Sequence, residues 1–281
     1  MPQRGANVSG APYRPGARET VCGMGLARIC AISATPRRRD NTAFLIRRFL
    51  VTDEALRYGD LALAAVADGA PTSQVPVHMV RAIVLATRGD FGAARAAIDE
   101  SRQIAESNAV MVWLGSVYTT WGWIAAETGH PEEGVACIER ALGLQEAIGL
   151  KSQLPTSYLR LADAHLAAGQ YEAAAVAARR ARDVAESLGA AGRRAGAIRA
   201  LADAGVETGD DGTEALYREL ERVARDLDLR PLQAHAHLGL GRLSHRAGRP
   251  GEAADHLATA LAMCRDMGMT HWVERAEALF R

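Results

Sequence analysis

The chain has 281 residues with 33 basic and 33 acidic side chains, and 48% of its residues are hydrophobic. This composition excludes wholesale disorder, and four cysteines are too few for a disulfide scaffold. The balanced charge excludes a whole-chain attraction to nucleic acid, and no apolar run reaches the roughly 18–20 residues of a membrane span. We therefore expect a cytoplasmic protein with no nucleic-acid or membrane partner.

Residues 1–40 differ from the rest of the chain. They carry seven arginines against Glu19 and Asp40, a balance of +5, and proline and glycine interrupt them repeatedly. The most apolar stretch, 21–33, contains Arg28 and two glycines, so it is a poor secretory signal. A nucleic-acid-binding arm is an alternative, but interleaved aromatic residues and lysines are missing. We predict a disordered basic leader or a start codon assigned too early.

The remainder of the chain is periodic. We predict that 41–74 form a degenerate first helical pair. Beyond it, short breaks centred on glycine recur every 39 or 40 residues, and a second series of breaks lies 19 or 20 residues after each member of the first. The first series is Gly89, Gly129, Gly169, Gly209 and Gly248. The second is Asn108, Gly149, Gly189, Asp228 and Gly268. The repeating unit is thus two segments of about 17 residues, as in a repeat protein.

Each segment has the pattern of a helix. Residues 172–188 contain no proline or glycine, and their apolar side chains recur near i, i+4 spacing. A glycine or asparagine after each segment suits the left-handed residue that ends a helix. Pro131 and Pro250 fall in the first turn, where a missing N–H costs little.

The pattern resembles tetratricopeptide (TPR) repeats. A small residue follows the loop glycine by five positions, an apolar residue precedes it by eight, and alanine follows it by twelve. These positions hold Ala94, Gly134, Ala174 and Ala253; Trp121, Leu161, Leu201 and Leu240; and Ala141, Ala181 and Ala260. The first unit departs at Arg81, and the fourth has Thr213, four residues after Gly209, at the small position. We predict an all-α TPR-like superhelical solenoid, with five repeats over 75–269 and a capping helix over 270–281.

The last repeats carry a more specific resemblance. Residues 230–243, 247–249, 256–263 and 267–272, together with 114–118, are similar to the carboxy-terminal TPR region of bacterial signalling proteins. Those proteins join an adenylate or guanylate cyclase domain, or a transcription-activator module, to a STAND-type AAA-like ATPase. The resemblance implies a sensor tail with no catalytic residues of its own.

Motifs for catalysis and metal binding are missing. A phosphate-binding loop needs Gly-Lys-Ser/Thr, and the single lysine, Lys151, follows Leu150 between two helices. His235 and His237 are two residues apart on a helix, so they point apart, and no histidine pair has i, i+4 spacing. Gly239-Leu240-Gly241 begins like a dinucleotide loop but lies within a helix. We expect no enzyme, no metal and no cofactor.

One candidate site remains. The first helices of stacked pairs line a concave face, and charged or aromatic side chains occupy its facing positions. We predict a partner-binding surface there, made of Trp123, Asp163, Arg199, Asp203, His235, Arg242 and His245. A groove of mixed charge with a tryptophan suits a peptide or a partner helix.

These observations favour a non-catalytic protein-interaction and regulatory module. Its partner would be a protein or peptide in the concave groove, with an ATPase or cyclase chain as one candidate. A small-effector sensor is the alternative, although the groove is expected to be poor in aromatic residues. A truncated remnant of a longer signalling protein, with no independent activity, is the third interpretation.

Overall fold

The computed structural model describes residues 53–278, and this part of the chain contains twelve α-helices and no strand. The all-α solenoid predicted from the sequence is therefore confirmed. The predicted leader, 1–40, and the start of the predicted first pair lie outside the described residues. In chain order the helices are α3 (Asp53–Val66), α4 (Pro71–Arg88), α5 (Phe91–Ser107), α6 (Met111–Glu127), α7 (Pro131–Ala147), α8 (Leu154–Ala167), α9 (Tyr171–Ser187), α10 (Ala191–Thr208), α11 (Thr213–Asp226), α12 (Arg230–Arg246), α13 (Pro250–Asp266) and α14 (Thr270–Ala278).

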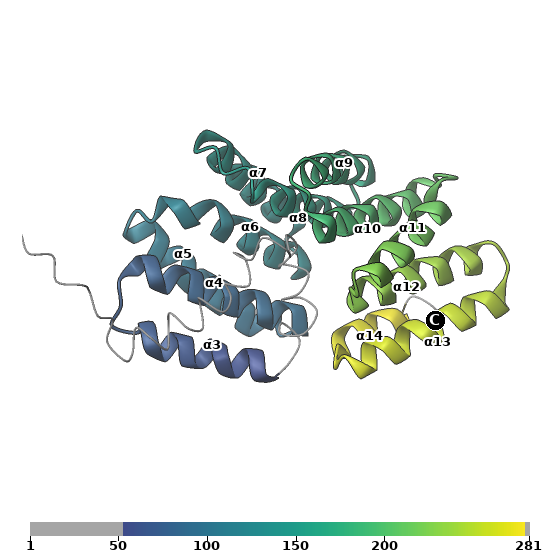
Figure 1. Ribbon diagram of the computed structural model, residues 1–281, viewed down its shortest axis with the longest axis horizontal. Coiled ribbons are helices and arrows are strands. Elements are labelled where there is room, and N and C mark those ends of the chain that lie inside the picture. The colour runs from purple at the N-terminus through teal and green to yellow at the C-terminus, as the bar shows by residue number, and fades with distance from the viewer. Residues whose placement is uncertain (1–52, 279–281) are drawn as a thin grey trace, which may run out of the picture.

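The helices form an arch with an inner and an outer layer (Figure 1). Five antiparallel pairs run from α4/α5 to α12/α13, with α3 before them and α14 after them. The first helices of successive pairs also pack on one another, from α4 on α6 to α10 on α12. These even-numbered helices make the inner layer, so they decide which side chains face the opening of the arch.

Small residues set the close packing within each pair. Ala94, Ala174 and Ala253 are at most 2% exposed, and the alanines at the second small position, 141, 181 and 260, are fully buried. In the second pair, Gly122 of α6 faces Gly134 of α7. A Cβ added at Gly122 would lie 2.7 Å from the carbonyl oxygen of Gly134. A larger side chain would force the helices apart, which explains why the sequence pattern keeps these positions small.

The fourth pair shows how a departure from the pattern is accommodated. Thr213 takes the place of the usual alanine and is 2% exposed. Its hydroxyl fills the space that a Cβ on Gly205 would need, and it donates to the carbonyl of Asp210. The glycine on α10 thus compensates for the bulkier residue on α11.

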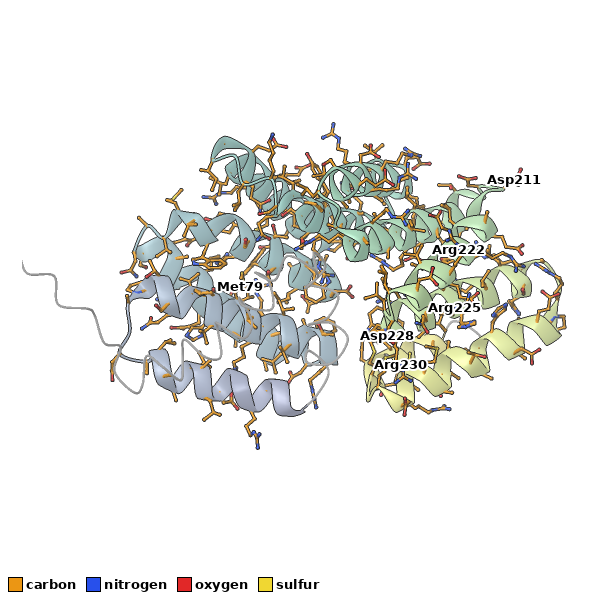
Figure 2. The ribbon with its side chains drawn as sticks, in the orientation of Figure 1. Met79, Asp211, Arg222, Arg225, Asp228 and Arg230 are labelled. Carbon is orange, nitrogen blue, oxygen red and sulfur yellow. The ribbon has the colours of Figure 1, made fainter. Side chains whose placement is uncertain are left out.

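The turns differ from expectation at one place. Eight loop glycines have positive φ, from +64° to +90°, as the break pattern predicted. After α5, however, Asn108 has φ −111°, and it is Ala109 that adopts φ +50°. Asp228 takes the left-handed position where α11 leads to α12 (Figure 2). Asn108, which does not take the left-handed conformation, donates its side-chain amide to the carbonyl of Ile104 at 2.9 Å.

Replacing Ala109 by glycine should therefore stabilise the protein. The left-handed conformation costs alanine about 1–2 kcal/mol, and the extra freedom of glycine in the unfolded chain offsets about half of that. We expect Ala109→Gly to raise the free energy of unfolding in urea by about 0.5–1 kcal/mol. The same substitution at the exposed helical Ala254 should instead lower it by about 1 kcal/mol. Equal effects at both positions would contradict this assignment.

Candidate functional site: a charged pocket on the concave face

The inner layer forms a pocket near the carboxy-terminal half of the arch. Its volume is about 230 Å³, and its walls come from α8, α10, α12 and α14 with contributions from the ends of α6, α9 and α11. We call it the concave pocket. Its polar and aromatic lining comprises Glu127, Asp163, Tyr171, Arg199, Asp203, Glu207, Tyr217, His235, Arg242, Trp272 and Arg275.

Asp203 is the centre of a hydrogen-bonded network at the base of the pocket. Its carboxylate accepts from Tyr217 Oη at 2.6 Å, from His235 Nε2 at 2.9 Å and from Arg199 Nη1 at 2.9 Å. Arg199 also donates to Asp163 on the neighbouring helix. These five residues, which we call the Asp203 network, join α8, α10, α11 and α12.

Burial and charge act in opposite directions on this network. Burial by itself would raise the pKa of Asp203, but His235 and Arg199 beside it, and the hydrogen bond from Tyr217, hold that pKa well below its usual range. Burial raises the pKa of Tyr217, and the neighbouring Asp203 carboxylate raises it further. Asp203 is therefore an anion and Tyr217 a neutral donor at any physiological pH.

A second group of charges lines the rim. Arg242 donates to Glu207, which also pairs with Arg246 at 3.2 Å. Burial opposes the charged form of Glu207, yet its hydrogen bonds to both arginines lower its pKa. Opposite this rim, Arg275 of α14 lies 3.4 Å from Glu127. Every carboxylate of the pocket lining thus has an arginine partner.

The residues predicted from the sequence are only partly brought together. Asp163, Arg199, Asp203, His235 and Arg242 all line the concave pocket.

The other two predicted residues lie outside the pocket lining. Trp123 is 7% exposed and lies beneath Arg160, whose guanidinium carbon is 3.6 Å from the ring centroid and whose Nη1 donates to Asp163. Trp123 therefore contacts the pocket only indirectly, by packing against the arginine that binds Asp163. His245 is exposed near the end of α12 and does not line the pocket. His245 follows His235 by ten residues, which turns its side chain about 80° around the helix from that of His235. Arg242 follows by seven residues, which turns it only about 20°, so Arg242 stays on the pocket side.

Sequence reasoning missed several lining residues. Glu207 follows Asp203 by four positions on α10, so helical spacing alone could have indicated it. Tyr217 could not be found in this way, because it belongs to the outer helix α11 and reaches the pocket past Gly239. Trp272 and Arg275 come from α14, which was predicted only as a cap.

No metal-binding group of three or more histidine, cysteine or acidic residues occurs within residues 53–278. His237 and His256 do meet, with their Nδ1 atoms 3.0 Å apart between α12 and α13. Burial lowers the pKa of His237. Glu221 acts in the opposite direction, and the neighbouring His256 and Arg225 lower the pKa further. The pair is thus a hydrogen-bonded contact between two helices. No helix in the same range is long and apolar enough to cross a membrane.

Comparison with known proteins places the fold among TPR-like helical repeat proteins. No protein-family model matches the sequence, and no curated protein matches it significantly. Among solved structures, a Rap protein complexed with Competence and Sporulation Factor is similar with a TM-score of 0.73 and 10% identity, covering 95% of this chain and 71% of that one.

Two further solved structures are similar. A STAND protein with a TPR sensor from Pyrococcus horikoshii has a TM-score of 0.63 and 13% identity, over 93% of this chain and 43% of that one. Aspartyl phosphate phosphatase F from Bacillus subtilis has a TM-score of 0.62 and 11% identity, over 88% and 59%. At these identities the similarity establishes the fold, and the neighbours are TPR-like helical repeat proteins.

Proposed function

We propose that this protein is a non-catalytic regulatory module that binds an extended peptide, or an extended segment of a partner protein, in the concave pocket. The observation that carries this proposal is the row of alternating carboxylates and guanidinium groups on α8, α10 and α12, which faces the opening of the arch.

The pairing of the charges determines which ligand suits the pocket. Because the carboxylates and arginines of the lining already neutralise one another, a strongly charged ligand would gain little net attraction. A peptide main chain is neutral but polar, so its N–H groups can donate to carboxylate oxygens and its carbonyl groups can accept from arginines. Tyr171 and Trp272 add apolar surface for one or two side chains.

The similar structures support the same class of function. The Rap protein was solved with Competence and Sporulation Factor, and the Pyrococcus horikoshii protein uses its TPR region as a sensor. Together with the sequence resemblance described above, they favour a sensor role beside an ATPase-linked cyclase or transcription regulator. The ligand would bias such a partner by binding more tightly to one curvature of the arch.

A small effector is the second candidate, and one observation favours it. Three aromatic side chains, Tyr171, Tyr217 and Trp272, line the pocket, which is more than the sequence led us to expect. The volume of about 230 Å³ is nevertheless below the roughly 300–1,000 Å³ of typical small-molecule sites. A peptide that leaves its ends outside the pocket fits this volume better.

Peptide selection tests the proposal. A displayed library of random peptides is selected on the full chain, and the dissociation constants of enriched peptides are measured by fluorescence anisotropy. We expect Arg199→Glu and Arg242→Glu each to weaken binding by at least about tenfold, which corresponds to about 1.4 kcal/mol.

Controls separate loss of binding from loss of folding. Tyr171→Ala removes pocket surface without touching the ion pairs, and it should weaken binding while leaving the melting temperature nearly unchanged. Arg179→Glu makes the same charge change on the exposed side of α9, outside the concave pocket, and should bind normally. Equal affinity for all variants, or no saturable binder, would contradict the proposal.

A further inference from the structure

The last helix of the chain reaches back to the first repeats. Arg275 of α14 is paired with Glu127 at the end of α6, 148 residues earlier, with 3.4 Å between Nη1 and Oε2. The ring of His271 meets Phe91 at the start of α5 edge to face, with centroids 5.3 Å apart. The two arms of the arch in Figure 1 are therefore in contact through α14.

The contact between α14 and the first repeats requires glycine at position 89. This residue, in the turn between α4 and α5, has φ +90°, and a Cβ there would overlap the side chain of His271. The turn and α14 thus approach more closely than any other residue type at position 89 would allow.

Closing the arch also completes the concave pocket. Trp272, Arg275 and Ala276 of α14 form one wall, while Glu127, from the opposite arm, forms another. The Trp272 ring stands edge-on to His235 of the Asp203 network, with centroids 6.2 Å apart. A ligand in this pocket would touch both arms at once.

The closing contacts are few, and the residues that make them are partly exposed. The side chains of Arg275 and Glu127 are 53% and 23% exposed, and exposed ion pairs contribute little to stability. Adjacent pairs, by contrast, are joined along whole helices, as α6 on α7 or α12 on α13. The weakest connection in the arch is therefore the one between its two ends.

We propose that the arch is a clamp: α14 separates from the turn at Gly89 and from Glu127 to admit a ligand to the concave pocket, and closes again over the bound ligand. This inference rests on the proposed function, because it describes how binding at the same pocket is regulated. A ligand that touches both arms favours the closed arch by its differential affinity for the two states.

Distance measurements on the protein alone test the clamp. Spin labels are placed at Glu132→Cys and Glu274→Cys, two exposed positions that flank the contact, in a chain whose four cysteines are replaced by alanine. Double electron–electron resonance should give mainly short distances in the otherwise unchanged chain. Arg275→Glu, which places like charges beside Glu127, should shift the distribution to longer and broader distances.

Two further variants make the test specific. Glu127→Arg combined with Arg275→Glu restores opposite charges and should restore the short distances. Arg230→Glu breaks another exposed pair, with Asp266 on the neighbouring helix α13, and should leave the distances unchanged. Long distances in the starting chain, or no change with Arg275→Glu, would overturn the clamp.

The peptide selected above distinguishes this proposal from the proposed function. His271→Ala removes the contact with Phe91, and His271 itself does not line the pocket, so the variant should weaken peptide binding about fivefold. Adding the peptide should return the labelled Arg275→Glu chain to short distances. If the peptide binds in the pocket without changing the distances, the clamp fails while the proposed function stands. If the distances respond to the variants but no peptide binds, the arch opens and closes at α14 as proposed, and the proposed peptide-binding function fails.

Discussion

Gly239→Ala is expected to lower the free energy of unfolding by about 2 kcal/mol, although alanine is the better helix former. Gly239 lies in the middle of α12, where a Cβ would overlap the ring of Tyr217. That ring is fully buried and its hydroxyl is fixed by Asp203, so it cannot move aside cheaply. Overpacking of this kind costs about 3 kcal/mol, and the helix propensity of alanine offsets about 1 kcal/mol of it.

A matched glycine provides the control for this prediction. Gly143 lies inside α7 with nothing within 4 Å of its missing Cβ, so Gly143→Ala should stabilise the protein by about 1 kcal/mol. Urea unfolding followed by circular dichroism measures both variants. Adding Tyr217→Leu should remove the penalty and leave Gly239→Ala stabilising by up to about 1 kcal/mol, because the clashing ring is gone. A stabilising effect of Gly239→Ala in the unchanged background would disprove the packing argument.

The repeat architecture could be predicted because it depends on local rules. Helical periodicity, left-handed glycines in the turns and small residues at the helix contacts each leave a signal at a fixed spacing. Gly134 and Ala174 could be assigned before the structure was known, since their role requires only a nearby helix. The same rules failed at Ala109, where a residue of low left-handed propensity takes the positive-φ position.

The concave pocket was harder to predict because it depends on three-dimensional neighbours. Asp203 and Arg199 share a face of α10, so both could be assigned to the concave face from the sequence. Tyr217 enters from an outer helix, and its access depends on a glycine 22 residues later on α12. Arg275 meets Glu127 only because the accumulated curvature of the repeats brings the two ends together. Curvature sums small rotations at every repeat, and no local pattern in the sequence records that sum.

Asp203→Asn tests the charge interactions of the Asp203 network, and it should lower the free energy of unfolding by about 3 kcal/mol at pH 7. Asparagine keeps the shape but removes the charge that faces Arg199 and His235, and its amide group points donors at donors. Arg199 would keep Asp163, which limits the loss to the lower end of the range for a broken buried pair. The exposed Asp60→Asn, which breaks a surface pair with Arg81, should change stability by less than about 0.5 kcal/mol.

The pH dependence of the free energy of unfolding, compared between the unchanged protein and Asp203→Asn, gives a second, independent readout. The pKa of Asp203 is depressed in the folded protein, so its stabilising contribution is fully present above the unfolded pKa of about 3.9 and is lost as the pH falls below it. Unfolding in urea should therefore show that the unchanged protein loses stability more steeply than Asp203→Asn between about pH 5 and pH 2. Parallel pH profiles would mean that the Asp203 carboxylate is stabilised no better in the folded chain than in water. In that case the Asp203 network would not be the preorganised base of the pocket on which the proposed binding depends.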